Sequence, residues 1–230
     1  MKGGVGKTTS VVELGTILAT EHEKKVLIID IDPQTNSTFS LIGLDEWGKI
    51  KDTATIADVL GMNKGLSSRD TEYDIKDAII ENVCEIENLD LIPSHIELTF
   101  LDIDLSSEPG RENILSRQIE KLTTNYDFVL IDCPPNLTIA PQNALVVSDH
   151  IIVPVSPEFY AAIGLPLLIN RVNQLKRKSI CKQTVFYSIY IIINSIYKCI
   201  FAFIVLVLSV YYLFFTSLNF SFVKNSPIDS

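Results

Sequence analysis

The 230-residue sequence has few of the residues that build disulfide frameworks or clustered metal sites. It contains four cysteines with no CxxC spacing, and its three histidines are isolated from one another. Neither a secreted disulfide scaffold nor a zinc site of closely spaced ligands is indicated. We expect the cysteines to be reduced thiols in a cytosolic protein.

Positive charge is also scarce. The chain has 19 Lys and Arg against 28 Asp and Glu, and residues 1–178 alone have 16 against 27, a net charge of −11. This balance argues against a generally basic surface that coats DNA. A small basic cluster is present at Arg171, Lys176, Arg177 and Lys178. It is open to two interpretations, a local DNA-binding patch or the solvated end of a helix.

The first residues carry the most specific motif. Residues 2–9 read Lys-Gly-Gly-Val-Gly-Lys-Thr-Thr. A Walker A phosphate-binding loop reads G-x-x-x-x-G-K-[ST], and Gly6-Lys7-Thr8 fits its end. Met1 stands in the slot of the first glycine, and the loop carries an additional lysine, Lys2. So many glycines, lysines and threonines in eight ordered positions favour a phosphate site over a chance turn.

This residue set suits a triphosphate. Small residues let the backbone curl so that successive N–H groups point at one anion, and the helix that follows adds its partial positive charge. Lys7 is predicted to reach the β- and γ-phosphates, and the Thr8 hydroxyl to ligate Mg²⁺. Thr9 is expected to donate to the α-phosphate. The predicted loop residues are Gly3, Gly4, Val5, Gly6, Lys7, Thr8 and Thr9.

Carboxylates at the ends of two apolar runs supply the metal side of the site. The run 26–29 leads into Asp30 and Asp32, which share a face if the strand continues that far. The run 128–131 leads into Asp132, the arrangement of a Walker B aspartate that holds Mg²⁺. Open α/β sheets bind ligands at the carboxyl ends of their strands, so these placements agree with the loop.

Apolar periodicity predicts alternating strands and helices, and therefore a mostly parallel sheet with helices on both faces. Strands are predicted at 26–29, 89–92, 128–131 and 151–155. Helices are predicted at 8–20, 53–60, 75–82, 111–124, 141–147 and 162–176.

Several further segments complete a family resemblance. They are Asp30-Ile31-Asp32-Pro33-Gln34, Leu91-Ile92-Pro93-Ser94, Gly110-Arg111-Glu112, Asp132-Cys133-Pro134-Pro135, Asn143-Ala144-Leu145 and Ile152-Val153-Pro154-Val155. With the lysine-containing loop, a deviant Walker A, they resemble the ParA/Soj partition ATPases of the ParA/MinD family. The resemblance covers residues 1–178. It implies a three-layer P-loop NTPase-like α/β domain.

The resemblance also implies a function. ATP would close two subunits into a homodimer, with Lys2 reaching the partner's nucleotide. Asp32 would orient the attacking water, and Asp30 and Asp132 would serve Mg²⁺. Pro154 and Pro157 fall where this fold frames the base. A ParB-like partner protein would stimulate hydrolysis, DNA binding would be non-specific, and the protein would be cytoplasmic and nucleoid-associated.

Two expectations concern the ends of the sequence. The family places a strand immediately before the loop, and here Met1 stands where that strand would end, so the first strand is expected to be missing. Residues 179–230 form a hydrophobic tail that departs from the family pattern.

Three interpretations of the tail stay open: an inner-membrane anchor at 199–223, a strand at 185–193 with a helix that completes the domain, or out-of-frame translation. The alternatives to a soluble partition ATPase are accordingly a membrane-anchored ATPase and an inactive remnant.

Overall fold

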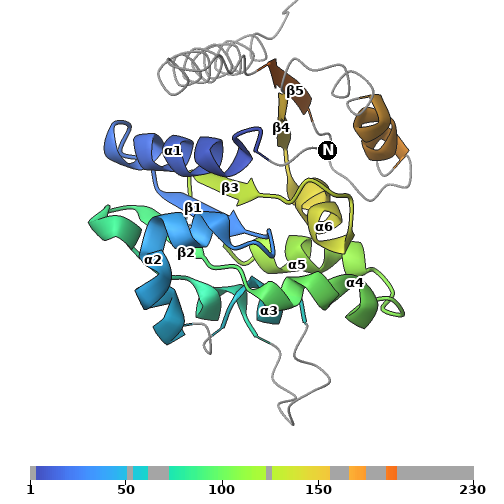
Figure 1. Cartoon of the computed structure of the whole chain (residues 1–230), viewed down its shortest axis with the longest axis horizontal. Coiled ribbons are helices and arrows are strands. Elements are labelled where there is room, and N and C mark those ends of the chain that lie inside the picture. Colours follow the sequence, from blue (N-terminus) through green and yellow to red (C-terminus); the bar gives the residue numbers. More distant parts are fainter. Residues whose placement is uncertain are drawn as a thin grey trace, which may run out of the picture.

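The computed structural model describes residues 4–50, 54–61, 73–122, 126–155, 166–174 and 185–190. Three strands form a parallel sheet in the order β2-β1-β3 (Figure 1). They are β1 (Val26–Asp30), β2 (Leu89–Ile92) and β3 (Phe128–Asp132). The register places Asp30 beside Asp132 at the carboxyl end of the sheet.

Alternation along β1 divides the core between the two faces of this sheet. Val26 and Ile28 belong to one buried cluster, whereas Leu27 and Ile29 belong to another, and none of the four is exposed. A strand that is apolar at four successive positions is typical of a parallel sheet covered on both faces. The sheet and both its layers therefore follow from one short apolar run.

Helices from separate parts of the chain cover the two faces (Figure 1). The first cluster contains residues of α1 (Lys7–Thr20) and α2 (Asn36–Ile50). The second contains residues of four helices on the other face. These are α3 (Ile56–Val59), α4 (Leu101–Asp104), α5 (Ile114–Ile119) and α6 (Ile139–Val147). The α/β architecture with helices on both faces is confirmed.

Two further strands form a separate parallel pair. β4 (His150–Val155) pairs with β5 (Val185–Tyr190) along its length, and neither strand joins the first sheet within the described residues. A helix at 166–174 packs beside β4, since its Leu168 and Val172 cluster with Val153.

The sequence placed all four predicted strands to within one residue but was less accurate for helices. The predicted helix at 111–124 is a 3-10 turn, η5 (Arg111–Asn113), followed by the short α5. The prediction at 75–82 is a 3-10 helix, η2 (Ile75–Ala78), and that at 53–60 is the single-turn α3. The sequence interpretation missed α2 altogether, because its polar first turn reads as a loop.

The tail is described only in part. Residues 185–190 form the strand that one of the three interpretations expected near that position. The candidate anchor at 199–223 lies outside the described residues. Among the residues that are described, no helix has the length and hydropathy needed to cross a bilayer. The proposed boundary between residues 178 and 179 stays a prediction.

Candidate active site

The glycine-rich loop leads directly into α1 in the way that the motif predicts. Gly4 and Gly6 adopt φ angles of 77° and 83°, which are strained for residues with a side chain. Helix α1 begins at Lys7, and the carbonyl of Gly6 accepts its first hydrogen bond, from the N–H of Ser10 at 2.9 Å. The N–H groups of that first turn have no acceptor within the helix. No acidic residue lies in the turn to neutralise them.

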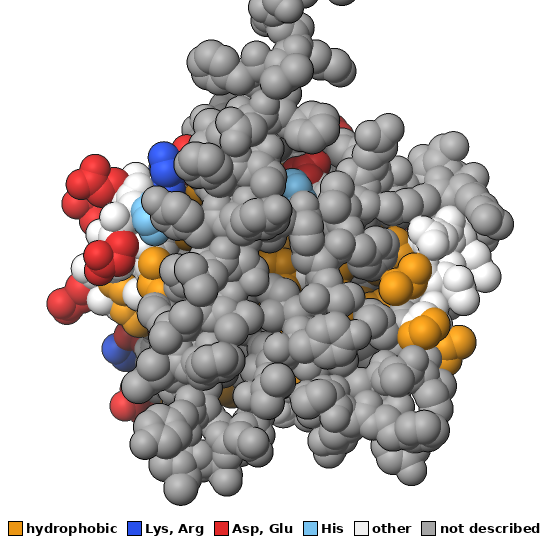
Figure 2. Space-filling model, turned by 90° about the horizontal axis from the view of Figure 1, so that it is seen from above, with side chains coloured by type: hydrophobic (Ala, Val, Ile, Leu, Met, Phe, Trp, Pro, Cys, Tyr) orange, Lys and Arg blue, Asp and Glu red, His pale blue; other side chains and the backbone are white. Residues whose placement is uncertain are grey.

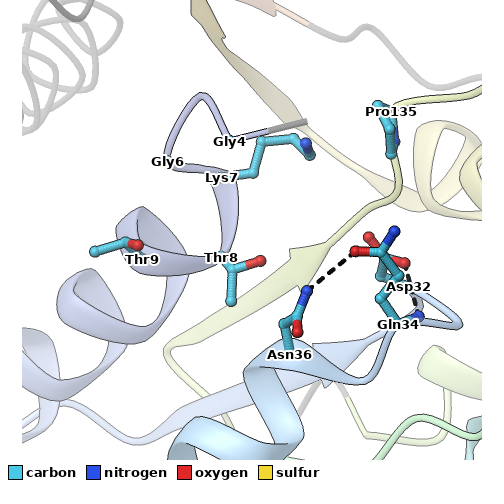
Figure 3. A pocket seen from close by; sticks show the side chains of 9 residues that line it. All are labelled: Gly4, Gly6, Lys7, Thr8, Thr9, Asp32, Gln34, Asn36 and Pro135. Carbon is cyan, nitrogen blue, oxygen red and sulfur yellow. Dashed lines mark hydrogen bonds between the residues drawn. The ribbon is translucent and has the colours of Figure 1, made fainter. Parts of the chain in front are cut away.

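A cavity of about 320 Å³ opens beside this loop, within the size range of small-ligand sites. Its lining residues come from the loop, α1, the segment after β1, the first residue of α2 and the segment after β3. They are Gly4, Gly6, Lys7, Thr8, Thr9, Asp32, Gln34, Asn36 and Pro135. Figure 3 shows the Lys7 side chain extended across the cavity toward Pro135. A cation, hydroxyl groups and a carboxylate thus converge on one space.

Asp132 links this loop to the sheet. Its Oδ2 accepts hydrogen bonds from the Thr8 hydroxyl at 2.7 Å and from the Ser37 hydroxyl at 2.6 Å. Its Oδ1 is buried and has no hydrogen-bond partner among the residues that the structure describes. Burial raises the pKa of the Asp132 carboxyl, and the two hydroxyl donors oppose that rise. A buried carboxylate oxygen without a donor is costly unless a cation or water completes it.

These groups fit a magnesium ion. Mg²⁺ prefers oxygen ligands, keeps several waters and usually takes only one or two carboxylates beside the phosphates of its substrate. The Thr8 hydroxyl and the unpartnered Asp132 oxygen provide such a set. Mg²⁺ does not need a site made entirely of protein ligands, because waters and phosphate oxygens complete its coordination. Among the described residues, no group of three or more His, Cys, Asp or Glu is arranged to hold an ion.

The two carboxylates after β1 have different surroundings. The strand ends at Asp30, so Asp32 lies in the loop beyond it and the two do not share a strand face. Asp32 lines the cavity, and its Oδ1 accepts the N–H of Gln34 at 2.9 Å. Asp30 is fully buried and is not among the lining residues. Its oxygens accept from the N–H of Asp32 and from both the N–H and the hydroxyl of Thr38.

Burial also shifts the protonation of these groups. It raises the pKa of Asp30 from 3.8 to about 7, against the three hydrogen bonds that favour the carboxylate. The neighbouring charge of Asp132 adds to the rise. Burial likewise raises the pKa of the Cys133 thiol, with neighbouring carboxylates acting in the same direction. Cys133 packs against the buried cluster on the face of the sheet that α3, α4, α5 and α6 cover.

Most of the predicted site residues that the structure describes come together. The cavity is lined by Gly4, Gly6, Lys7, Thr8, Thr9 and Asp32, and Asp132 contacts Thr8. Val5 lies within the loop, whereas Pro154 lies in β4 and is not among the lining residues. Lys2, Gly3 and Pro157 lie outside the described residues. The roles assigned to individual residues, including Asp30 as a metal group, stay predictions.

Sequence reasoning missed the contribution of α2. Ser37, in its first turn, donates to Asp132, and Asn36 and Gln34 line the cavity. Figure 3 shows the amide of Asn36 directed at the side chain of Gln34, and the two are 3.2 Å apart. A helix-start signal was present, since Asn, Ser and Thr follow Pro33 closely.

Comparison with known proteins identifies the family. A family model described as an AAA domain matches residues 1–185. The sporulation initiation inhibitor protein Soj of Bacillus subtilis is 36% identical over 184 residues, which cover 76% of this chain and 63% of Soj. The chain belongs to the ParA/Soj family of partition ATPases.

A second curated relative also belongs to the partition proteins. The chromosome partitioning protein ParA of Caulobacter vibrioides is 36% identical over 177 residues, covering 76% of the chain and 60% of ParA. The chain thus spans less than two thirds of the length of these curated relatives.

The fold of this chain is also similar to that of a solved structure. It is cobyrinic acid a,c-diamide synthase of Mycobacterium smegmatis with a bound ATP analogue and magnesium. The identity is 27% and the TM-score 0.70, over 88% of this chain and 77% of that one.

Proposed function

We propose that this ParA/Soj family member binds Mg²⁺-ATP in the 320 Å³ cavity and hydrolyses it to ADP and phosphate. One observation carries the proposal. The Thr8 hydroxyl, at the start of α1, lies 2.7 Å from the Asp132 carboxylate, at the end of β3, beside the glycine loop. This meeting of a Walker A hydroxyl with a strand-end aspartate is what a P-loop NTPase needs to hold its metal.

Each residue then has a defined task. The N–H groups at the start of α1, which have no acceptor within the helix, bind the phosphates, and the Lys7 ammonium offsets charge on the β- and γ-phosphates. Thr8 and Asp132 would hold Mg²⁺, with Asp30 behind them as a predicted further metal group. When bound, the ion neutralises charge that develops on the phosphates. Asp32 lines the cavity and orients the attacking water from there.

The wider function is proposed from family membership. The protein would form an ATP-dependent homodimer in which Lys2 reaches the partner's nucleotide, and it would act in plasmid or chromosome partition. A ParB-like protein would stimulate hydrolysis, and the location would be cytoplasmic and nucleoid-associated. Since phosphoryl transfer depends on cations placed near developing charge, a lysine supplied by a second subunit would couple hydrolysis to dimerisation.

Non-specific DNA binding would have to occur on a chain that is acidic as a whole. The chain carries a net charge of −9, and acidic side chains gather along one edge of the face seen in Figure 2. Of the basic cluster near residue 176, only Arg171 lies in the described part of the chain, where its guanidinium contacts Gln174 at 3.3 Å. A DNA site would therefore have to be local.

A binding and hydrolysis experiment on the full chain tests the proposal. We expect Mg²⁺-dependent ATP binding, release of phosphate and an ATP-dependent dimer in light scattering. Lys7→Ala should weaken ATP binding about 10- to 100-fold, because a charged hydrogen bond contributes about 1.5–3 kcal/mol. Lys49→Ala is the matched control, since Lys49 is an exposed lysine on α2 that pairs with Glu46.

Two outcomes would contradict the ATPase proposal or its dimer part. If the chain binds no ATP, or if Lys7→Ala and Lys49→Ala behave alike, the ATPase proposal is wrong and the inactive remnant is the better description. If ATP is bound and hydrolysed by a monomer whose activity is unchanged by Lys2→Ala, the dimer part alone is wrong.

A further inference from the structure

A ring of four residues holds the backbone of Asp32 from both sides. The N–H of Asp32 donates to Asp30 Oδ1 at 3.1 Å, and the carbonyl of Asp32 accepts from the Ser94 hydroxyl at 2.6 Å. Thr38 closes the ring, because its hydroxyl donates to Asp30 Oδ2 at 2.8 Å and accepts from the N–H of Ser94 at 3.0 Å. Asp30, Thr38 and Ser94 are fully buried, and Asp32 is 6% exposed.

The ring joins three elements that are distant in the sequence. Asp30 ends β1, Thr38 lies in the first turn of α2, and Ser94 follows β2. The carbonyl of Ser94 also accepts from the indole of Trp47 at 3.4 Å, and that ring stacks on the imidazole of His95. The far end of α2 therefore anchors Ser94 as well.

The side chain of Asp32 depends on this backbone for its direction. Its Oδ1 accepts one N–H, that of Gln34, which lies two residues along the same loop. A bond inside a loop moves with the loop and does not fix its place relative to the cavity. The contacts of the Asp32 backbone with Asp30 and Ser94, by contrast, join the loop to β1 and to the segment after β2.

We propose that Thr38 and Ser94 are positioning residues for ATP hydrolysis, which hold the Asp32 backbone so that its carboxylate faces the attacking water. This inference rests on the proposed ATPase function. Neither residue lines the cavity, so neither touches the substrate. Loss of either hydroxyl removes a bond from a buried group and loosens the loop, and a displacement of about 1 Å can lower a rate about 100-fold.

Matched substitutions at Thr38 isolate the hydroxyl from the shape of the side chain. Thr38→Val keeps the shape and removes the hydroxyl, whereas Thr38→Ser keeps the hydroxyl. Ser94→Ala removes the second hydroxyl of the ring. Ser40→Ala is the control, since the Ser40 hydroxyl lies on exposed α2 surface and donates to the carbonyl of Asn36 outside the ring.

Two measurements are made on the full chain, kcat and KM for ATP and amide hydrogen exchange of residues 30–38 without nucleotide. We expect Thr38→Val and Ser94→Ala to lower kcat about 10- to 100-fold with KM within about twofold. Amide exchange of residues 30–38 should be faster in both variants, and the urea midpoint should fall, because each leaves a buried polar group without its hydrogen-bond partner. Thr38→Ser and Ser40→Ala should match the unsubstituted protein. If Thr38→Val does not fold, the comparison of kcat between Ser94→Ala and Thr38→Ser tests the proposal.

Contrary results separate this inference from the proposed function. If the unsubstituted protein hydrolyses ATP and both hydroxyl-free variants match it in kcat, the ring does not position Asp32 and only the inference is overturned. A rise in KM at unchanged kcat overturns it too, because the ring would then support nucleotide binding. If the unsubstituted protein does not hydrolyse ATP while folding normally, the proposed function is wrong and the ring has no reaction to serve.

Discussion

Single residues around Asp32 combine tight hydrogen bonding with backbone strain. Thr35 is a β-branched residue at φ 60° that is only 3% exposed. Its N–H donates to the carbonyl of Asp32 at 2.9 Å, and its own carbonyl accepts the N–H of Phe39 in α2. A β-branched residue in the left-handed region is a true outlier, and such outliers persist where the surroundings determine them. Here those surroundings are the loop that carries Asp32 and the first turn of α2.

The strain at Thr35 gives a prediction that compares two truncations. Both Thr35→Ala and Thr35→Gly remove the side chain, but only glycine removes the cost of the left-handed conformation. We expect Thr35→Gly to be more stable than Thr35→Ala by about 1 kcal/mol in urea unfolding. At Glu13, exposed within α1, the order should reverse, with glycine about 1 kcal/mol less stable than alanine. If Thr35→Ala were as stable as Thr35→Gly or more stable, the backbone at Thr35 would not be strained.

At the scale of elements, the packing of α1 on the sheet sets where the phosphate loop lies. Gly15 allows the close approach, because a Cβ there would lie 2.7 Å from Ile28 Cδ1 on β1 and 3.5 Å from Leu130 Cδ1 on β3. The helix carries the loop at one end and this contact near its middle. A side chain at Gly15 would therefore move Lys7 and Thr8 relative to Asp132.

Glycines in two helices provide a matched test of that contact. Gly48 is exposed in α2 with open space around its Cα, so Gly48→Ala should stabilise the protein by about 0.5–1 kcal/mol. Gly15→Leu should instead destabilise it by about 1–3 kcal/mol, because the core beneath α1 is overpacked. Unfolding in urea measures both. ATP affinity should fall for Gly15→Leu only, and an unchanged affinity would show that the contact does not position the loop.

At the scale of the whole molecule, we expect the proposed nucleotide binding to be coupled to folding. The cavity is lined by the loop, α1, the segment after β1, the first residue of α2 and the segment after β3. A ligand in the cavity would therefore contact several elements that are distant in the sequence. A ligand that binds only the folded state stabilises that state by RT ln(1 + [L]/Kd). Bound Mg²⁺-ATP should therefore stabilise the chain as a unit.

The predicted size of that stabilisation is about 2.7 kcal/mol at a ligand concentration of 100 Kd. For a chain of this length the shift in Tm is about 5–10 °C, measured by thermal unfolding with Mg²⁺-ATP. EDTA should remove part of the shift, because the buried oxygen of Asp132 then loses the cation that completes it. In the Asp132→Ala variant, the shift in Tm that ATP causes should be the same with and without Mg²⁺. An equal shift with and without Mg²⁺ in the unsubstituted chain would contradict a metal role for Asp132.

Short stretches of the sequence were enough to predict the features that local patterns encode. The glycine–lysine loop, the apolar strands and the aspartates at their ends are each written in a few consecutive residues, and the structure places them together. Strand β1 was predictable because Val26–Ile29 is apolar throughout, which only a sheet covered on both faces requires.

Features that depend on contacts between distant residues emerged only in the folded chain. The first turn of α2 reads as a polar loop until Asp30 accepts the N–H of Thr38 and Ser37 meets Asp132, 95 residues away. The place of Ser94 beside Asp32 likewise joins residues 62 positions apart. Propensity and periodicity act over a few residues, whereas these hydrogen bonds exist only once β1, β2 and β3 lie side by side.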